Sequence, residues 1–103
     1  MKAYLITPGS KTVESVDISG IEDIIDLIGF NTIEADAIDE NGTRLYFDEE
    51  CFIRGNAVNG RFQLDSLIPV AGLAVVAGTD KDAEDICDVI VDIDELRERI
   101  KFL

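Results

Sequence analysis

Carboxylates are the residues of this chain best suited to chemistry, and most of them gather in two stretches. Of the 22 Asp and Glu residues in the 103-residue chain, 15 lie within residues 34–50 and 80–96. The first stretch carries seven acids against one arginine, and the second carries eight against one lysine. Such groups can run acid–base chemistry, hold a divalent cation or attract a cationic surface.

The other groups that catalytic sites commonly use are missing. The chain has no histidine, which argues against Ser-His-Asp and Cys-His catalysis and against histidine-ligated zinc. Cys51 and Cys87 are too few for a four-cysteine zinc site, and Gly72 and Gly78 do not fit a dinucleotide-binding G-x-G-x-x-G. Because 22 acids on a small surface bring some pair together by chance, the carboxylates alone do not indicate an enzyme. We therefore expect no catalytic residues, no cofactor and no resident metal.

One acidic segment opens like a calcium-binding loop. Asp80, Asp82 and Glu84 alternate as the first ligands of an EF-hand do. An EF-hand then needs glycine at its sixth position and glutamate at its twelfth, where this chain has Asp85 and Val91. A solvated acidic loop is the favoured interpretation.

The cysteines and the opening residues indicate the compartment. Both cysteines lie in apolar stretches without a C-x-x-C, which favours reduced, core-filling thiols over redox sensors or a Cys51–Cys87 disulfide. The apolar opening ends at Pro8-Gly9, too early for a signal peptide, and no apolar run approaches the ~20 residues of a membrane helix. We expect a cytoplasmic protein that makes no membrane contact.

Turn signals separate several strand-like segments. Asn-Gly is a strong hairpin signal because both residues tolerate positive φ. The predicted hairpins join residues 2–7 with 13–18 across Pro8-Gly9-Ser10, 32–38 with 43–48 across Asn41-Gly42, and 51–58 with 61–64 across Asn59-Gly60. After the turn at residues 69–72, the run Leu73–Ala77 is apolar at every position, which predicts a central strand covered on both faces. Residues 86–91 are predicted as one more strand.

Two segments have helix signals. Ser19 and Glu22 have capping-box spacing before a stripe formed by Ile21, Ile24, Ile25 and Ile28, and Gly29 is a natural C-terminal stop. Later, Asp92 is predicted to cap a helix whose inner stripe is Ile93, Leu96 and Ile100. The apolar ending Phe102-Leu103 is expected to dock onto the body. Together these elements predict a single α+β domain over residues 1–103, with a mostly antiparallel sheet of hairpins and two short helices.

Three short motifs carry a family resemblance. They are the opening M-K-A-x-L-I-x-P-G, Asn41-Gly42 followed by Leu45-Tyr46 and Glu49-Glu50, and an A-G-x-x-V-V-x-G-x-D segment that begins at Ala71. Together they resemble a family of small uncharacterised proteins from bacteria, bacteriophages and other mobile elements. The chain departs from the pattern at Asn59-Gly60-Arg61, where asparagine and arginine would be adjacent. The resemblance implies a phage-type origin and transfers no activity or functional residue.

The net charge of −13 favours a non-catalytic acidic binding protein. Its field repels DNA, RNA and anionic membranes and attracts cationic surfaces, which are common on proteins that handle nucleic acid. We therefore expect a phage-type inhibitor that occupies the basic nucleic-acid-binding surface of a host defence protein, of the anti-restriction or anti-CRISPR type. The residues predicted to bind the partner are Glu34, Asp36, Asp39, Glu40, Asp48, Glu49, Glu50, Asp80, Asp82, Glu84, Asp85 and Asp88.

Two other functions fit the same sequence. A small-ligand-binding module could use Arg44, Arg54 and Arg61 around the turn at Pro69–Gly72. An accessory domain could carry its charge only for solubility. Exposed sheet edges would also suit a homodimer.

Overall fold

The computed structural model of the chain describes residues 1–53, 60–80 and 85–103. Its elements in chain order are β1 (Lys2–Thr7), β2 (Thr12–Asp17), α1 (Ile21–Ile28), β3 (Ile33–Ala37), β4 (Arg44–Asp48), β5 (Arg61–Leu64), β6 (Val70–Ala71), β7 (Ala74–Thr79), β8 (Ile86–Cys87), α2 (Ile93–Arg99) and β9 (Ile100–Phe102). All of the strand pairs are antiparallel. Two helices with antiparallel sheets confirm the predicted α+β class.

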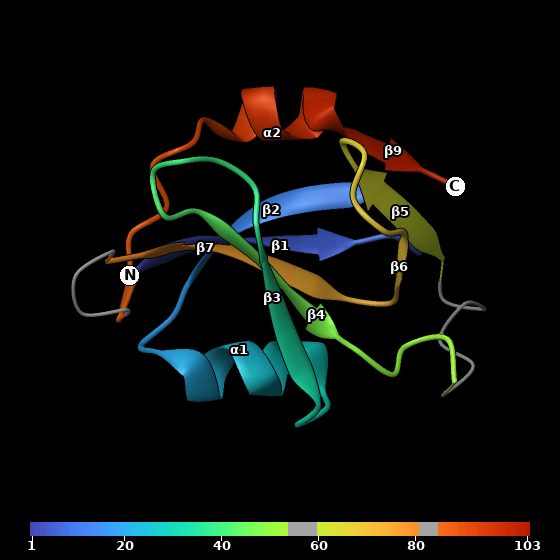
Figure 1. Cartoon of the computed structure of the whole chain (residues 1–103), viewed down its shortest axis with the longest axis horizontal. Coiled ribbons are helices and arrows are strands. Elements are labelled where there is room, and N and C mark those ends of the chain that lie inside the picture. Colours follow the sequence, from blue (N-terminus) through green and yellow to red (C-terminus); the bar gives the residue numbers. More distant parts are fainter. Residues whose placement is uncertain (54–59, 81–84) are drawn as a thin grey trace.

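The elements stack in three layers (Figure 1). The main sheet has the strand order β2-β1-β7-β4-β3, and β8 pairs with the end of β7. Helix α1 covers one face of this sheet. Helix α2 and a small second sheet, with the order β6-β5-β9, cover the other face.

Strand β7 is the centre of the structure. All of its residues are buried, as predicted for a strand covered on both faces. Val75 and Ala77 belong to the cluster packed with α1, whereas Ala74 and Val76 belong to the cluster on the opposite face. This split follows from the alternation of side chains along a strand. β7 therefore holds together the two halves of the core.

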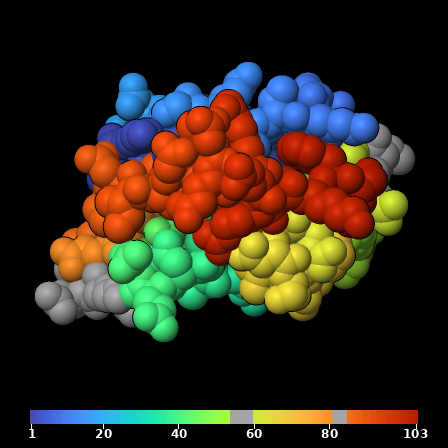
Figure 2. Space-filling view, turned by 90° about the horizontal axis from the view of Figure 1, so that it is seen from above, coloured from blue at the N-terminus to red at the C-terminus, as the bar shows by residue number. Residues whose placement is uncertain are grey.

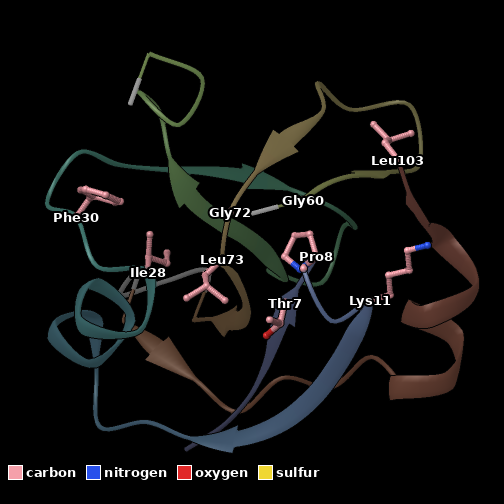
Figure 3. Close-up of a pocket in the computed structure, with 10 residues that line it drawn as sticks. Thr7, Pro8, Lys11, Ile28, Phe30, Gly60, Gly72, Leu73 and Leu103 are labelled. Atoms are coloured by element: carbon pink, nitrogen blue, oxygen red, sulfur yellow. The ribbon is translucent and has the colours of Figure 1, made fainter. Parts of the chain in front are cut away.

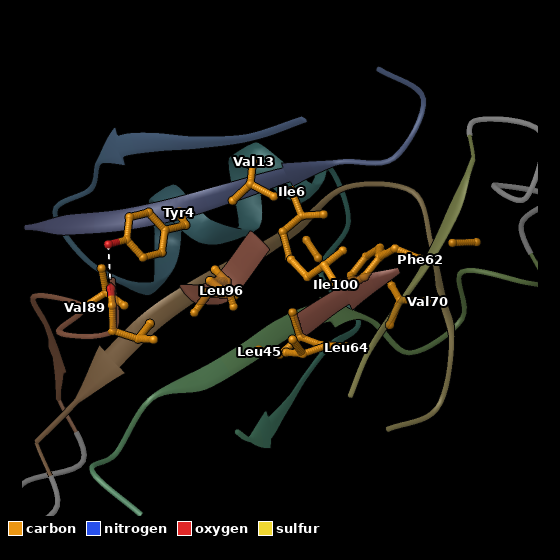
Figure 4. Packing of buried hydrophobic residues seen from close by; sticks show 14 of the residues in the cluster. Tyr4, Ile6, Val13, Leu45, Phe62, Leu64, Val70, Val89, Leu96 and Ile100 are labelled. Atoms are coloured by element: carbon orange, nitrogen blue, oxygen red, sulfur yellow. Dashed lines mark hydrogen bonds between the residues drawn. The ribbon is translucent and has the colours of Figure 1, made fainter. Parts of the chain in front are cut away.

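The larger half of the core lies between the main sheet and the α2 side (Figure 4). Ile6, Phe62 and Leu96 are completely buried there. The buried hydroxyl of Tyr4 donates a hydrogen bond of 2.6 Å to the carbonyl of Val91. Since a buried polar group without a partner is costly, this bond fixes the segment before α2 against β1.

Helix α1 forms at the predicted place, but only part of its predicted apolar stripe packs against the core. Ile24 and Ile28 are buried, Ile25 is half-buried, and Ile21 is 43% exposed. The apolar stripe is therefore wider than the face that packs. Its C-terminal stop is confirmed, because Gly29 is left-handed at φ 92° and its N–H donates to the carbonyl of Ile25.

The predicted capping box at α1 is wrong. Gly20 is the N-cap and has no side chain with which to bond the helix. Instead, the carboxylate of Asp23 accepts a 2.7 Å bond from the backbone N–H of Ser19. The acid in the first turn thus reaches back to the preceding chain, while the serine hydroxyl does not cap.

The end of the chain follows the prediction, except that Ile100, expected on the inner stripe of the last helix, lies in a strand instead. The carboxylate of Asp92 accepts bonds from the backbone N–H groups of Asp94 and Glu95, so it caps α2. The helix ends at Arg99, and Ile100 opens β9, which pairs with β5. The apolar C-terminus therefore docks onto the body, as expected.

Two predicted strands differ from the structure. Cys51–Ile53 forms a turn, residues 54–59 and with them Asn59 lie outside the described residues, and β5 pairs with β6 and β9. The strand predicted at 86–91 is only Ile86–Cys87 long, because the chain then leaves β7 and crosses to β1, where the N–H of Val89 donates to the carbonyl of Lys2. The pairing of β5 with β9 and the contact of Val89 with Lys2 join residues far apart in sequence, so a local sequence pattern does not predict them.

Both cysteines are free thiols, as predicted. Cys51 is buried and its Sγ accepts a 3.4 Å bond from the N–H of Ala71, so it acts as a core filler. No helix in the described part of the chain is long and apolar enough to cross a membrane.

Candidate functional site

The two acidic stretches meet at one end of the main sheet. Strand β4 begins beside the end of β7, because Arg44 lies opposite Ala77 in the antiparallel register. The turn that enters β4 and the chain that leaves β7 are therefore neighbours. Figure 2 shows the turn, in green, beside the orange residues of the second stretch.

We call this region the acidic end. It comprises six described carboxylates, of which Asp39 is half-buried and the others are exposed: Asp39, Glu40, Asp80, Asp85, Asp88 and Glu95. The turn before β4 and the ends of β7 and β8 are brought together by the strand pairing, and α2 adds Glu95 beside Asp39.

Asp39 shapes the turn that presents these acids. One of its carboxylate oxygens accepts bonds from the N–H groups of Asn41 at 2.7 Å and Thr43 at 3.2 Å. Partial burial raises the pKa of Asp39, but the hydrogen bonds from Asn41 and Thr43 and the charge of Arg99 outweigh it, so the pKa lies below its ordinary value. Asp39 is therefore ionised at neutral pH.

Arg99 fastens the turn to α2. Its guanidinium donates a 2.7 Å bond to the carbonyl of Ile38 and forms an ion pair of 2.5 Å with Asp65. The hydrogen bond that Arg99 donates to the carboxylate of Asp65 raises the pKa of Arg99 above its ordinary value. Arg99 therefore holds the turn in place, and because Asp65 shares its charge, Arg99 offsets the charge of Asp39 and Glu95 only in part.

An exposed apolar side chain lies among these charges. Ile90 is 68% exposed. It borders a shallow recess of about 240 Å³, together with Asp39, Glu95 and Arg99. Large apolar side chains at the centre of a polar rim are typical anchors of protein interfaces.

The remaining predicted contacts do not belong to the acidic end. Glu34 lies opposite Phe47, at the far end of the β3–β4 hairpin, and Glu49 and Glu50 follow β4 at that same far end. Asp36 is half-buried in the middle of the edge strand β3. The predicted contacts Asp82 and Glu84 lie outside the described residues.

A family model described as Domain of unknown function (DUF3846) matches residues 1–101. The chain belongs to this family. No curated protein and no solved structure matches it. Membership of the DUF3846 family confirms the expected resemblance to an uncharacterised family and supplies no activity to transfer.

Asp48 was predicted as a partner contact in this DUF3846 chain, and the structure corrects that. Its side chain is only 2% exposed. Its carboxylate accepts bonds from the hydroxyl of Thr32 and, at 3.1 Å, from the N–H of Glu50. Asp48 therefore ties the start of β3 to the end of β4. The bond to the residue two positions on is an Asx turn, a local signal that the sequence does offer.

Asp48→Ala is expected to lower the free energy of unfolding by about 2 to 3 kcal/mol, because it removes charge-assisted hydrogen bonds between a buried carboxylate and part-buried donors. The matched control is the exposed neighbour Glu49→Ala, which should stay within about 0.5 kcal/mol of the parent chain. Urea denaturation followed by circular dichroism measures both. Equal effects would show that Asp48 has no structural role.

The described arginines proposed for an alternative small-ligand site in this DUF3846 chain do not line one pocket. A hollow of about 780 Å³ includes Gly72, at the end of the predicted turn. Neither Arg44 nor Arg61 lines it, and Arg54 lies outside the described residues. The predicted arginine set is therefore not gathered around this hollow.

Among the described residues, no three or more His, Cys, Asp or Glu side chains are placed to hold a metal ion. The calcium-like loop includes Asp82 and Glu84, which lie outside that part of the chain, so its interpretation as a solvated loop stays a prediction.

Proposed function

We propose that this DUF3846 member is a non-catalytic acidic binding protein whose acidic end docks onto the basic surface of a protein that handles nucleic acid. The observation that carries the proposal is the convergence of two distant acidic stretches at one end of the sheet. A net charge of −13 supplies a long-range field that would accelerate encounter with a cationic surface.

The acidic end is suited to replace phosphates. Arg99 and the hydrogen bonds around Asp39 hold its backbone, so little conformational freedom is lost on binding. A basic channel that binds carboxylates in place of DNA phosphates releases counterions in a similar way, which makes the binding depend on salt.

Ile90 would add an apolar contact to the electrostatic one. Charges at an interface chiefly set the association rate, whereas a buried central side chain slows dissociation. Because Ile90 is exposed beside Asp39 and Glu95, it would bury its surface when the acidic end docks.

For the class of partner, we propose a host defence protein with a basic nucleic-acid channel, of the restriction or CRISPR type, bound in the cytoplasm. The charge of the chain and its resemblance to phage and mobile-element proteins support this choice. DNA would compete with the chain for the same surface.

Charge reversal tests the proposal. The triple variant Glu40→Lys, Asp85→Lys and Glu95→Lys changes three exposed acids of the acidic end whose side chains form no hydrogen bond with the described residues. The binding partner is first captured from host lysate with the unmodified chain. We expect the triple variant to lower the rate of association with this partner about tenfold or more, because rim charges act chiefly on that rate. The measurement is surface kinetics between 0.1 and 1 M salt, over which the Debye length falls from ~10 to ~3 Å.

The control carries the same charge change elsewhere. Glu14→Lys, Asp26→Lys and Glu49→Lys reverse exposed acids on β2, on α1 and just after β4, away from the acidic end. This variant should lower the association rate less than threefold. A partner that binds equally well at 1 M salt and is insensitive to the first variant would refute the electrostatic proposal.

A further inference from the structure

The 780 Å³ hollow lies where three chain segments meet (Figure 3). The turn after β1, the backbone around Gly60 and the turn before β7 form its walls. A Cβ at Gly60 would lie 2.7 Å from the carbonyl carbon of Pro8, and the N–H of Gly72 donates to the carbonyl of Gly60. The backbones therefore touch, and the walls are already formed without a ligand.

The lining of this hollow is chemically divided. Ile28, Phe30 and Leu73 lie toward one side, and Lys11 lies at the opposite side beside Leu103 (Figure 3). Among the described residues of the lining, Lys11 is the only one with a charged side chain, and no Asp or Glu side chain contributes. In a chain with 22 acids and 9 bases, a hollow lined by one lysine and no acid differs sharply from the rest of the surface.

Lys11 adopts a conformation that its side chain disfavours. Its φ is 55°, in the left-handed region, where glycine or asparagine would be less strained. Its N–H donates a 3.1 Å bond to the carbonyl of Pro8, which closes the turn. No ion pair of Lys11 occurs within the described residues, so its charge remains available to a ligand.

We propose that this hollow binds a small organic acid, with its anionic head at Lys11 and its apolar body against Ile28, Phe30 and Leu73. The volume falls in the range of small-molecule sites, roughly 300–1,000 Å³. The site lies at the Pro8–Lys11 turn of the β1–β2 hairpin, away from the acidic end near Lys2, so it is a second function of the chain. An acyl or aryl carboxylate and an organic phosphate monoester share the chemistry that this lining recognises.

Chemical-shift titration of the full chain tests the site with defined probes. The probes are 4-phenylbutyrate, the neutral 4-phenylbutanol with the same apolar body, phenyl phosphate, and inorganic phosphate as a head without a body. We expect the two organic anions to shift the amide signals of Thr7, Lys11, Phe30 and Leu73, and to bind at least fivefold more tightly than either the alcohol or inorganic phosphate. Which organic anion binds better identifies the preferred head group.

Two lysine variants separate recognition from general charge. Lys11→Glu should weaken 4-phenylbutyrate binding about fivefold to tenfold, since it replaces attraction with repulsion. Lys2→Glu makes the same charge change at the opposite end of the β1–β2 hairpin and should change binding less than twofold. If Lys11→Glu does not fold, Lys11→Gln, which keeps the length of the stem, should still weaken binding about threefold.

Several outcomes would overturn the proposal. Equal affinity for 4-phenylbutyrate and 4-phenylbutanol would show that Lys11 does not recognise the anionic head. Equal affinity for 4-phenylbutyrate and inorganic phosphate would show that the hollow binds an adventitious ion only. Shifts confined to residues outside the lining would locate the binding elsewhere. Each result is independent of the acidic end, because the acidic end repels the three anionic probes and has no charge attraction for the neutral alcohol.

Discussion

Gly78→Ala is expected to lower the free energy of unfolding by about 3 kcal/mol, at the upper end of what overpacking costs. A Cβ at Gly78 would lie 2.4 Å from the carbonyl oxygen of Asp88 and 3.0 Å from that of Cys87. Both obstacles are backbone atoms, which cannot rotate away as a side chain could. The substitution must therefore push β8 off β7 and pull Asp88 from its 2.7 Å bond with the N–H of Lys2.

Urea denaturation of the Gly78→Ala variant and the parent chain measures the difference in their free energies of unfolding. The matched control is Gly20→Ala, since a Cβ at Gly20 meets nothing within 4 Å. That control should change stability by less than about 1 kcal/mol, the scale of ordinary glycine effects. If both variants lose the same stability, then the close approach of β8 to Gly78 is not the reason that this position requires glycine. Asp85 and Asp88 of the acidic end flank β8, so Gly78→Ala should also slow association with the proposed partner.

Ile24→Asp is expected to destabilise the chain by about 4 kcal/mol or more, because it removes apolar burial and places a charge without a partner in the core. Ile24 is completely buried between α1 and the main sheet. Ile25→Asp should cost clearly less, since Ile25 is only half-buried, and Asp26→Lys should stay within about 0.5 kcal/mol. Denaturation of the three variants under one set of conditions gives the order.

This order also decides how α1 is rotated. The four isoleucines of the stripe are equivalent in sequence, so they predict equal sensitivity at Ile24 and Ile25. The structure buries Ile24 and Ile28, one turn apart, and leaves the others at the side of the contact. An Ile25→Asp variant as damaging as Ile24→Asp would contradict the rotation described here.

Part of the fold was predictable because its signals are local. The hairpin around Asn41-Gly42, the cap at Asp92 and the stop at Gly29 each depend on residues within a few positions of one another. The burial of β7 was also readable, because an apolar residue at every position needs cover on both faces. The sequence by itself likewise determined the strong negative charge and the absence of histidine.

Tertiary structure alone decided which of these elements meet. Strand β5 pairs with β9 near the C-terminus, with paired residues 36 to 40 positions apart in sequence, because the end of the chain returns over the core. The order β7-β4 turns two separate acidic stretches into one acidic end, and it leaves Glu49 at the other end of the hairpin. Asp48 reads as one more surface acid, yet Thr32 and Glu50 satisfy its carboxylate in the interior. The physical reason is the same in each case: burial and pairing between distant segments depend on the order of strands in the sheet, which no local pattern encodes.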